Sequence, residues 1–131
     1  MLKRLDNIGV AVRDLGQAHR FYTEVLGLDA PPLGDEEFGF SARLGDISLY
    51  IFKSTGPERQ QRDADLATNP PGIDHLAFEV EDFEVAQAEL ERRGVRFVQD
   101  VIGEPGQFRY RGFHDPEGNM LYVVHTGASP A

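Results

Sequence analysis

Alternating apolar and polar residues mark two similar stretches of the chain, each followed by a helix start. Every second residue is apolar over about residues 5–13 and again over residues 75–80. Because successive side chains of a strand point to opposite faces, each stretch predicts a half-buried strand. Asp14 and Asp82 then stand where a helix N-cap belongs, with a carboxylate that accepts from the first free amides.

The two stretches also match residue by residue. Superposing them aligns Asp6 with Asp74, Asn7 with His75, Val12 with Val80 and Asp14 with Asp82. We interpret this as an internal duplication that gives two similar modules.

The remainder of the first half predicts a helix and a hairpin. The helix runs from Asp14 to about residue 26 and ends at Gly27. Strands follow at about 38–44 and 47–52, joined by a two-residue turn at Gly45 and Asp46. This register places Ser41, Arg43, Ser48 and Tyr50 on one face and Leu44, Ile47, Leu49 and Ile51 on the opposite, helix-covered face.

The second half predicts the same order of elements. A helix over 83–93 ends at Gly94, a strand follows near 95–98, and a hairpin pairs 108–114 with 120–125. Pairing across its turn places Tyr110, Gly112 and His114 on the same face as Met120, Tyr122 and Val124. The polar residues between the modules are expected to form either a lid or binding loop, or an inert exposed loop.

Composition and charge exclude several classes of protein. The chain has 131 residues and no cysteine, so it has no disulfide framework and no thiolate site. Its net charge of -9 argues against a nucleic-acid surface and would favour a cationic ligand over long range. No apolar run is long enough for a membrane span, and the N-terminus lacks a signal-peptide core. We therefore expect a cytoplasmic protein that binds neither nucleic acid nor membranes.

Four motifs resemble the vicinal oxygen chelate superfamily, which includes glyoxalase I, bleomycin resistance proteins and extradiol dioxygenases. They are VRDL at residues 12–15, FYTEVLGL at 21–28, DHLAFEVED at 74–82 and FHDPEGN at 113–119. The resemblance implies an α+β fold of two βαβββ modules that form a curled, cleft-shaped mixed sheet with helices outside. We expect a single domain over 1–131, with module one at 3–54, a linker at 55–71 and module two at 72–126. The resemblance further implies a homodimer.

Enzymes of this superfamily hold a divalent metal with four side chains in the cleft. The resemblance places those ligand positions at Asn7, Tyr50, His75 and Tyr122. Only His75 keeps a typical ligand, because a phenol must first lose a proton whose pKa is near 10. We therefore predict no bound metal and no cofactor.

Three functions remain open from the sequence. The first is a binding protein of the bleomycin-resistance type that holds a small molecule without a metal. The second is a lyase, isomerase or dioxygenase acting on a small oxygenated substrate, with His75 as a general base or residual metal ligand and a tyrosine as the acid. The third is a non-catalytic interaction module whose cleft is closed by its own tyrosines. The predicted cleft lining is Asn7, Ser41, Arg43, Tyr50, His75, Tyr110, His114 and Tyr122.

Overall fold

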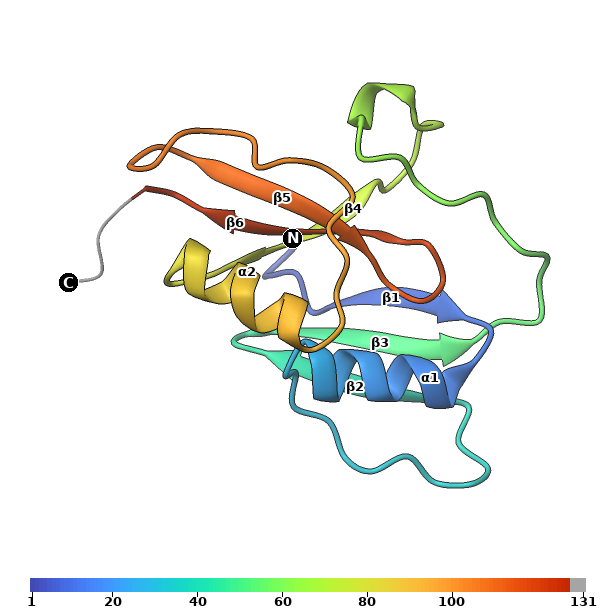
Figure 1. Cartoon of the computed structure of the whole chain (residues 1–131). Helices are drawn as coiled ribbons and strands as arrows, with labels where there is room; N and C mark the ends of the chain where they lie inside the picture. Colours follow the sequence, from blue (N-terminus) through green and yellow to red (C-terminus); the bar gives the residue numbers. More distant parts are fainter. Residues whose placement is uncertain (128–131) are drawn as a thin grey trace. The chain divides into compact units, whose positions relative to one another are not determined.

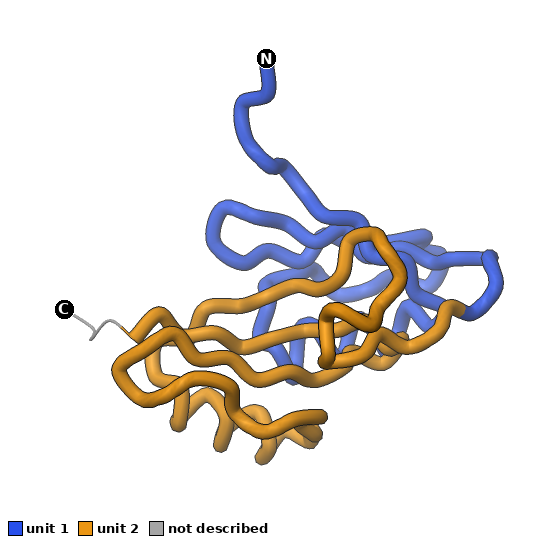
Figure 2. Tube along the Cα trace, turned by 90° about the horizontal axis from the view of Figure 1, so that it is seen from above, with its two compact units in different colours: residues 1–58 blue, residues 59–131 orange. Residues whose placement is uncertain are grey.

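A computed structural model describes residues 1–127 of the chain. The chain divides into two compact units, residues 1–58 and residues 59–131 (Figure 2). The boundary falls within residues 55–71, the predicted linker, and places residues 59–71 with the second unit.

Unit one is a three-stranded sheet with a helical segment on one side. It contains β1 (Asn7–Val12), α1 (Leu15–Arg20), the π-helical turn η1 (Phe21–Val25), β2 (Gly39–Leu44) and β3 (Ile47–Lys53) (Figure 1). The strand order is β1-β3-β2, with β1 parallel to β3 and β2 antiparallel to it.

Unit two repeats this arrangement. It contains the short 3-10 helix η2 (Leu66–Thr68), β4 (His75–Glu79), α2 (Phe83–Arg92), β5 (Arg109–His114) and β6 (Met120–His125). The order β4-β6-β5, with β4 parallel to β6, is the order of the first sheet. The two stretches that look duplicated in the sequence therefore form equivalent edge strands, and the α+β fold class is confirmed.

The predicted helix starts and hairpin turn are also confirmed. Asp14 accepts a hydrogen bond from the Gln17 amide at 3.0 Å, and Asp82 accepts one from the Val85 amide at 3.0 Å. Gly45 has a φ of 60° in the turn between β2 and β3, a backbone conformation that glycine adopts without strain.

Two elements differ from the sequence expectation. The first helix changes to a π-helical turn at Phe21, where the Leu26 amide donates to the Phe21 carbonyl at 3.0 Å. The strand expected near 95–98 is reduced to an isolated bridge between Phe97 and Phe113. The hydrogen bond of this bridge runs from the Val98 amide to the Gly112 carbonyl at 2.9 Å, and the Phe97 ring also contacts Phe113 and Arg111 of β5. A single bridge is too short to count as a strand.

In each sheet one face is buried against the longer helix of its own unit. We call the opposite face the open face, although in unit two its residues Met120 and Tyr122 are buried as well. The buried side chains of unit one include Val10, Val12, Phe40, Ala42, Leu49 and Ile51. In unit two Arg109 lies over the Phe83 ring of α2, at 4.6 Å from the ring centroid, which identifies the helix side of the second sheet. Leu44 and Ile47 are on the predicted face but are exposed, because they end the hairpin beyond the reach of the helix.

No helix among the described residues is long and apolar enough to cross a membrane.

Substitution of Gly112 in β5 tests how closely the side chains on the open face of the second sheet are packed. A Cβ atom there would lie 2.6 Å from Met120 Cε and 2.9 Å from Tyr122 Cε1, so Gly112→Ala should destabilise the protein by about 1–3 kcal/mol. Gly16 of α1 is the control, because its Cβ would meet nothing closer than 3.5 Å and alanine favours a helix by about 0.5–1 kcal/mol. Urea unfolding measures both variants. Equal stability of Gly112→Ala and wild type would show that this face is loosely packed.

Candidate functional site

Four of the predicted lining residues lie on the open face of the second sheet. His75 on β4, Tyr110 and His114 on β5 and Tyr122 on β6 share this face, as the register requires. The structure brings three of them into one aromatic cluster. The Tyr122 ring meets the His75 ring edge-on at 4.8 Å and the Tyr110 ring edge-on at 5.5 Å.

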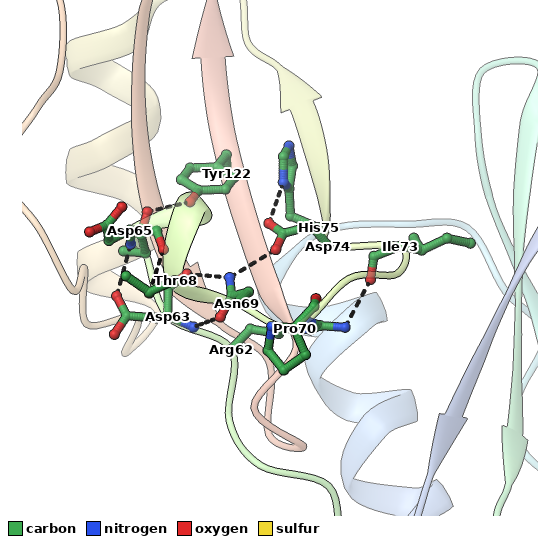
Figure 3. A network of polar contacts seen from close by, with 11 residues as sticks. Arg62, Asp63, Asp65, Thr68, Asn69, Pro70, Ile73, Asp74, His75 and Tyr122 are labelled. Atoms are coloured by element: carbon green, nitrogen blue, oxygen red, sulfur yellow. Dashed lines mark hydrogen bonds and ion pairs between the residues drawn. The ribbon is translucent and has the colours of Figure 1, made fainter.

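Tyr122 is the buried centre of this cluster. Its side chain is only 2% exposed, and its hydroxyl donates to the Ala64 carbonyl at 3.0 Å (Figure 3). Burial, with smaller contributions from nearby acidic groups such as Asp74, raises the pKa of Tyr122 to about 12. The phenol therefore stays protonated at neutral pH, and it donates its proton in a hydrogen bond to a backbone carbonyl.

His75 is oriented by its neighbour in the chain. Its Nδ1 lies 2.8 Å from Asp74 Oδ1, and Asn69 donates to the other oxygen of Asp74 at 2.8 Å (Figure 3). Burial acts to raise the pKa of Asp74, but the hydrogen bonds from His75 and Asn69 and nearby positive charge outweigh it, so the pKa is lowered overall. An ionised Asp74 favours the His75 tautomer with a proton on Nδ1. Among residues 1–127, the Nε2 atom of His75 has no hydrogen-bond partner.

His114 is used to hold a loop. Its Nε2 lies 2.6 Å from the Arg62 carbonyl oxygen and its Nδ1 lies 2.9 Å from Gln61 Nε2. Both ring nitrogens are therefore engaged by residues of the segment before β4.

The sequence left that segment open as either a lid or binding loop or an inert exposed loop, and the predicted lining included none of its residues. We call residues 59–69 the cover segment, because its Gln61, Arg62 and Ala64 bond to His114 and Tyr122 on the open face of the second sheet. The inert-loop interpretation of the sequence does not describe it. Its contacts are largely to backbone carbonyls, which leave no pattern in a sequence.

The other four predicted residues lie on the open face of the first sheet. Asn7 on β1, Ser41 and Arg43 on β2 and Tyr50 on β3 share it, since Tyr50 pairs with Ser41 and Asn7 pairs with Ser48. All four are exposed.

Two phenylalanines extend this face and were not predicted as part of the lining. The rings of Tyr50 and Phe52 are nearly parallel at 5.6 Å, and those of Phe52 and Phe38 are nearly parallel at 6.1 Å. Phe52 follows Tyr50 by two residues, so the strand period places its side chain on the same face as Tyr50. The three rings present a stacked aromatic surface.

The donor set at the implied metal positions does not fit a divalent ion. In unit one the Asn7 amide donates to Asp6 at 2.8 Å, and Tyr50 offers a phenol. In unit two the Tyr122 phenol is protonated and donates to a carbonyl, which leaves His75 as the one usual ligand. Among the described residues, no group of three or more histidine, aspartate or glutamate side chains is placed to hold an ion.

Elemental analysis tests this mismatch. Protein purified without chelator, incubated with zinc, nickel, manganese or iron and then desalted, should retain far less than one equivalent of metal. His75→Ala is the control, because it removes the one usual ligand. Stoichiometric metal in the wild type that is lost in His75→Ala would contradict the prediction.

The raised pKa of Tyr122 predicts a specific loss of stability at high pH. A phenol whose folded pKa of about 12 exceeds the unfolded value near 10 stabilises the folded state fully below pH 10. This contribution is lost as the pH rises through about 12. The difference in unfolding free energy between wild type and Tyr122→Phe should therefore shrink from pH 9 upward in urea titrations. A constant difference would show that Tyr122 titrates normally.

Comparison with known proteins places the chain in a family. The sequence profile described as "Glyoxalase/Bleomycin resistance protein/Dioxygenase superfamily" matches residues 4–123. Glyoxylase I 4 of Arabidopsis thaliana is 29% identical over 131 residues, covering 98% of this chain and 74% of the relative. Glutathione transferase FosA of Serratia marcescens is 30% identical over 133 residues, covering 100% and 86%.

A solved structure agrees with the sequence matches. The crystal structure of SMU.1112c superposes with a TM-score of 0.75 at 25% identity, covering 95% of this chain and 99% of the other. The chain therefore belongs to the glyoxalase/bleomycin resistance protein/dioxygenase superfamily.

Proposed function

We propose that the protein binds a small molecule on an open sheet face without using a metal ion. The observation that carries this proposal is the pair of phenols, Tyr50 and Tyr122, at two of the positions where the resemblance implies metal ligands. A protonated phenol supplies aromatic surface and one hydrogen bond, which suit an organic ligand better than an ion.

The chemistry of the predicted lining supports the same proposal. Ligand sites combine apolar and aromatic surface with a small number of polar groups that fix orientation. The first face provides stacked rings beside Asn7, Ser41 and Arg43, and the second provides His75 beside Tyr110 and Tyr122. We also propose that the protein is a cytoplasmic homodimer, as expected from its sequence and its family resemblance.

A thermal-shift screen in the presence and absence of EDTA tests metal-free binding. A ligand present at 100 times its Kd should stabilise the fold by about 2.7 kcal/mol, which raises Tm by several degrees. The shift should be the same with and without chelator. A shift that disappears in EDTA would contradict metal-free binding, and the absence of any shift across aromatic and oxygenated compounds would contradict binding itself.

The Asp74–His75 pair supports a second candidate, a metal-free enzyme that moves a proton. With Nδ1 donating to Asp74, Nε2 of His75 carries the lone pair and can take a proton from a carbon acid. The positive charge that forms on the imidazole is compensated by Asp74. Because the Tyr122 hydroxyl is committed to Ala64, it does not supply the acid, and the same imidazole returns the proton to the substrate.

Exchange of carbon-bound hydrogen in heavy water tests this second candidate. Small hydroxy ketones and 2-oxo acids, followed by NMR, should exchange faster with the wild type than with buffer, and His75→Ala should lower the rate by about 10²–10⁴-fold. Asp74→Asn should give an intermediate rate, because it removes only the orienting carboxylate. Unchanged exchange in a folded His75→Ala variant would exclude this mechanism.

A further inference from the structure

The His75 side chain combines a restrained ring with an accessible nitrogen. Its Nδ1 lies 2.8 Å from Asp74 Oδ1, and the Tyr122 ring contacts the imidazole edge-on at 4.8 Å. The side chain is nevertheless 33% exposed, and its Nε2 points away from Asp74 (Figure 3). The protein therefore fixes one side of the imidazole and leaves the other side free to meet a substrate.

Asn69 connects Asp74 to the cover segment. Its Nδ2 donates to Asp74 Oδ2 at 2.8 Å and to the Asp63 carbonyl at 2.9 Å, and its Oδ1 accepts from the Asp63 amide at 2.7 Å (Figure 3). These contacts fix the orientation of the Asn69 amide, because turning it over would place its oxygen against a carboxylate and a carbonyl. The side chain is therefore held by the cover segment and presents a hydrogen to Asp74.

Asp74 passes this restraint on to His75. One carboxylate oxygen is bonded to Asn69, so the carboxylate cannot turn without breaking that bond, and its other oxygen stays directed at Nδ1. An accepting oxygen at this place favours the imidazole tautomer that carries its proton on Nδ1. In that tautomer the lone pair of the neutral ring is on Nε2, which is the accessible nitrogen.

The cover segment supports the same imidazole from a second side. Its Ala64 carbonyl accepts a hydrogen bond from the Tyr122 hydroxyl at 3.0 Å, and the Tyr122 ring contacts His75. Ala64 and Asn69 both belong to the cover segment. Both restraints on His75 therefore start from one stretch of the chain.

Arg62 anchors the cover segment around Asn69. It is only 7% exposed, and its guanidinium donates to the Pro70 carbonyl at 2.8 Å and the Ile73 carbonyl at 3.4 Å, two groups that lie between Asn69 and Asp74 in the chain (Figure 3). A buried cation that loses its carbonyl partners is unfavourable, so this connection is held in place. The distance between Asn69 and Asp74 is thereby set by the loop and not by their own bond alone.

We propose that Asn69 is a positioning residue, through which the cover segment sets the tautomer of His75 and so lets Nε2 accept a proton. This inference rests on the second candidate function, the metal-free proton transfer, and assigns the control of its base. The proton leaves the substrate carbon for Nε2 and later returns to the substrate, whose carbonyl holds the electron pair in between. Asn69 touches neither the substrate nor the imidazole, and it acts through Asp74.

Thr68 provides a matched control for a role of Asn69 in the loop alone. Its hydroxyl donates to the Asp65 carbonyl at 2.8 Å, which is a hydrogen bond within the cover segment (Figure 3). No hydrogen bond among the described residues joins the Thr68 side chain to Asp74. Thr68→Ala therefore weakens the segment without breaking the connection from Asn69 to His75.

Nitrogen NMR of the neutral His75 imidazole tests the proposal without any substrate. The wild type should show mainly the tautomer with the proton on Nδ1. Asn69→Ala should shift the ratio of the two tautomers roughly tenfold toward protonated Nε2, because a charge-assisted hydrogen bond is lost. Thr68→Ala should resemble the wild type.

An unchanged tautomer ratio in a folded Asn69→Ala variant would overturn the role of Asn69, and so would an equal shift in Thr68→Ala. Asn69→Ser, which also removes the amide that reaches Asp74, replaces Asn69→Ala in this measurement should that variant fail to fold. Retention of the wild-type ratio in Asn69→Ser would count against the proposal in the same way.

Hydrogen exchange of the substrate then tests the consequence for the reaction. Asn69→Ala should lower kcat roughly tenfold and leave KM within about twofold, because Asn69 does not contact the substrate. In an Asp74→Ala background the same substitution should have no further effect, since Asn69 acts only through Asp74. A full additional loss in that background would overturn the proposal. If the wild type exchanges no substrate at all, it is the second candidate function that fails, and the NMR measurement still decides the role of Asn69.

Discussion

A three-stranded sheet has two faces, and the longer helical segment of each unit, α1 with η1 in unit one and α2 in unit two, covers only one of them. The helix-covered faces are conventional cores in which Ile51 and Leu121 are fully buried. The other face of each sheet requires a separate solution, because exposed apolar surface is unfavourable. In unit two the cover segment lies over this face and bonds to Tyr122 and His114. In unit one Tyr50 and Phe52 lie over Gly39 and Gly9, and Tyr50 remains exposed.

Burial of a phenol explains why the cover of unit two is held so specifically. A buried hydroxyl without a partner is unfavourable, so Tyr122 needs an acceptor within hydrogen-bond distance. Ala64 provides a carbonyl, which requires the chain to pass directly over the ring. His114 and Arg62 then fix the segment on both sides of that contact. A carboxylate at position 122 would instead repel the carbonyl, so the residue that removes a metal ligand also favours the cover.

The sequence predicted the features that depend on local periodicity and left out those that depend on the backbone. The duplication, the caps at Asp14 and Asp82 and the strand registers follow from side-chain spacing, which the structure confirms. The faces of the candidate residues followed from the same spacing. The sequence left the cover segment open between a binding loop and an inert loop, and its contacts were not predictable, because they use the carbonyls of Arg62 and Ala64, which every sequence possesses. The π-helical turn at Phe21 likewise carries no distinct pattern.

Equivalent residues in a duplicated fold need not share a function. Tyr50 and Tyr122 have the same residue type, strand position and register, so sequence alone assigns them one role. Their surroundings differ, since one ring faces outward beside Arg43 and the other donates to a carbonyl beneath the chain. A hydroxyl already bonded within the protein gains little from a ligand, because a new bond must replace an existing one. The exposed tyrosine has no such cost, and it is therefore the better candidate for recognition.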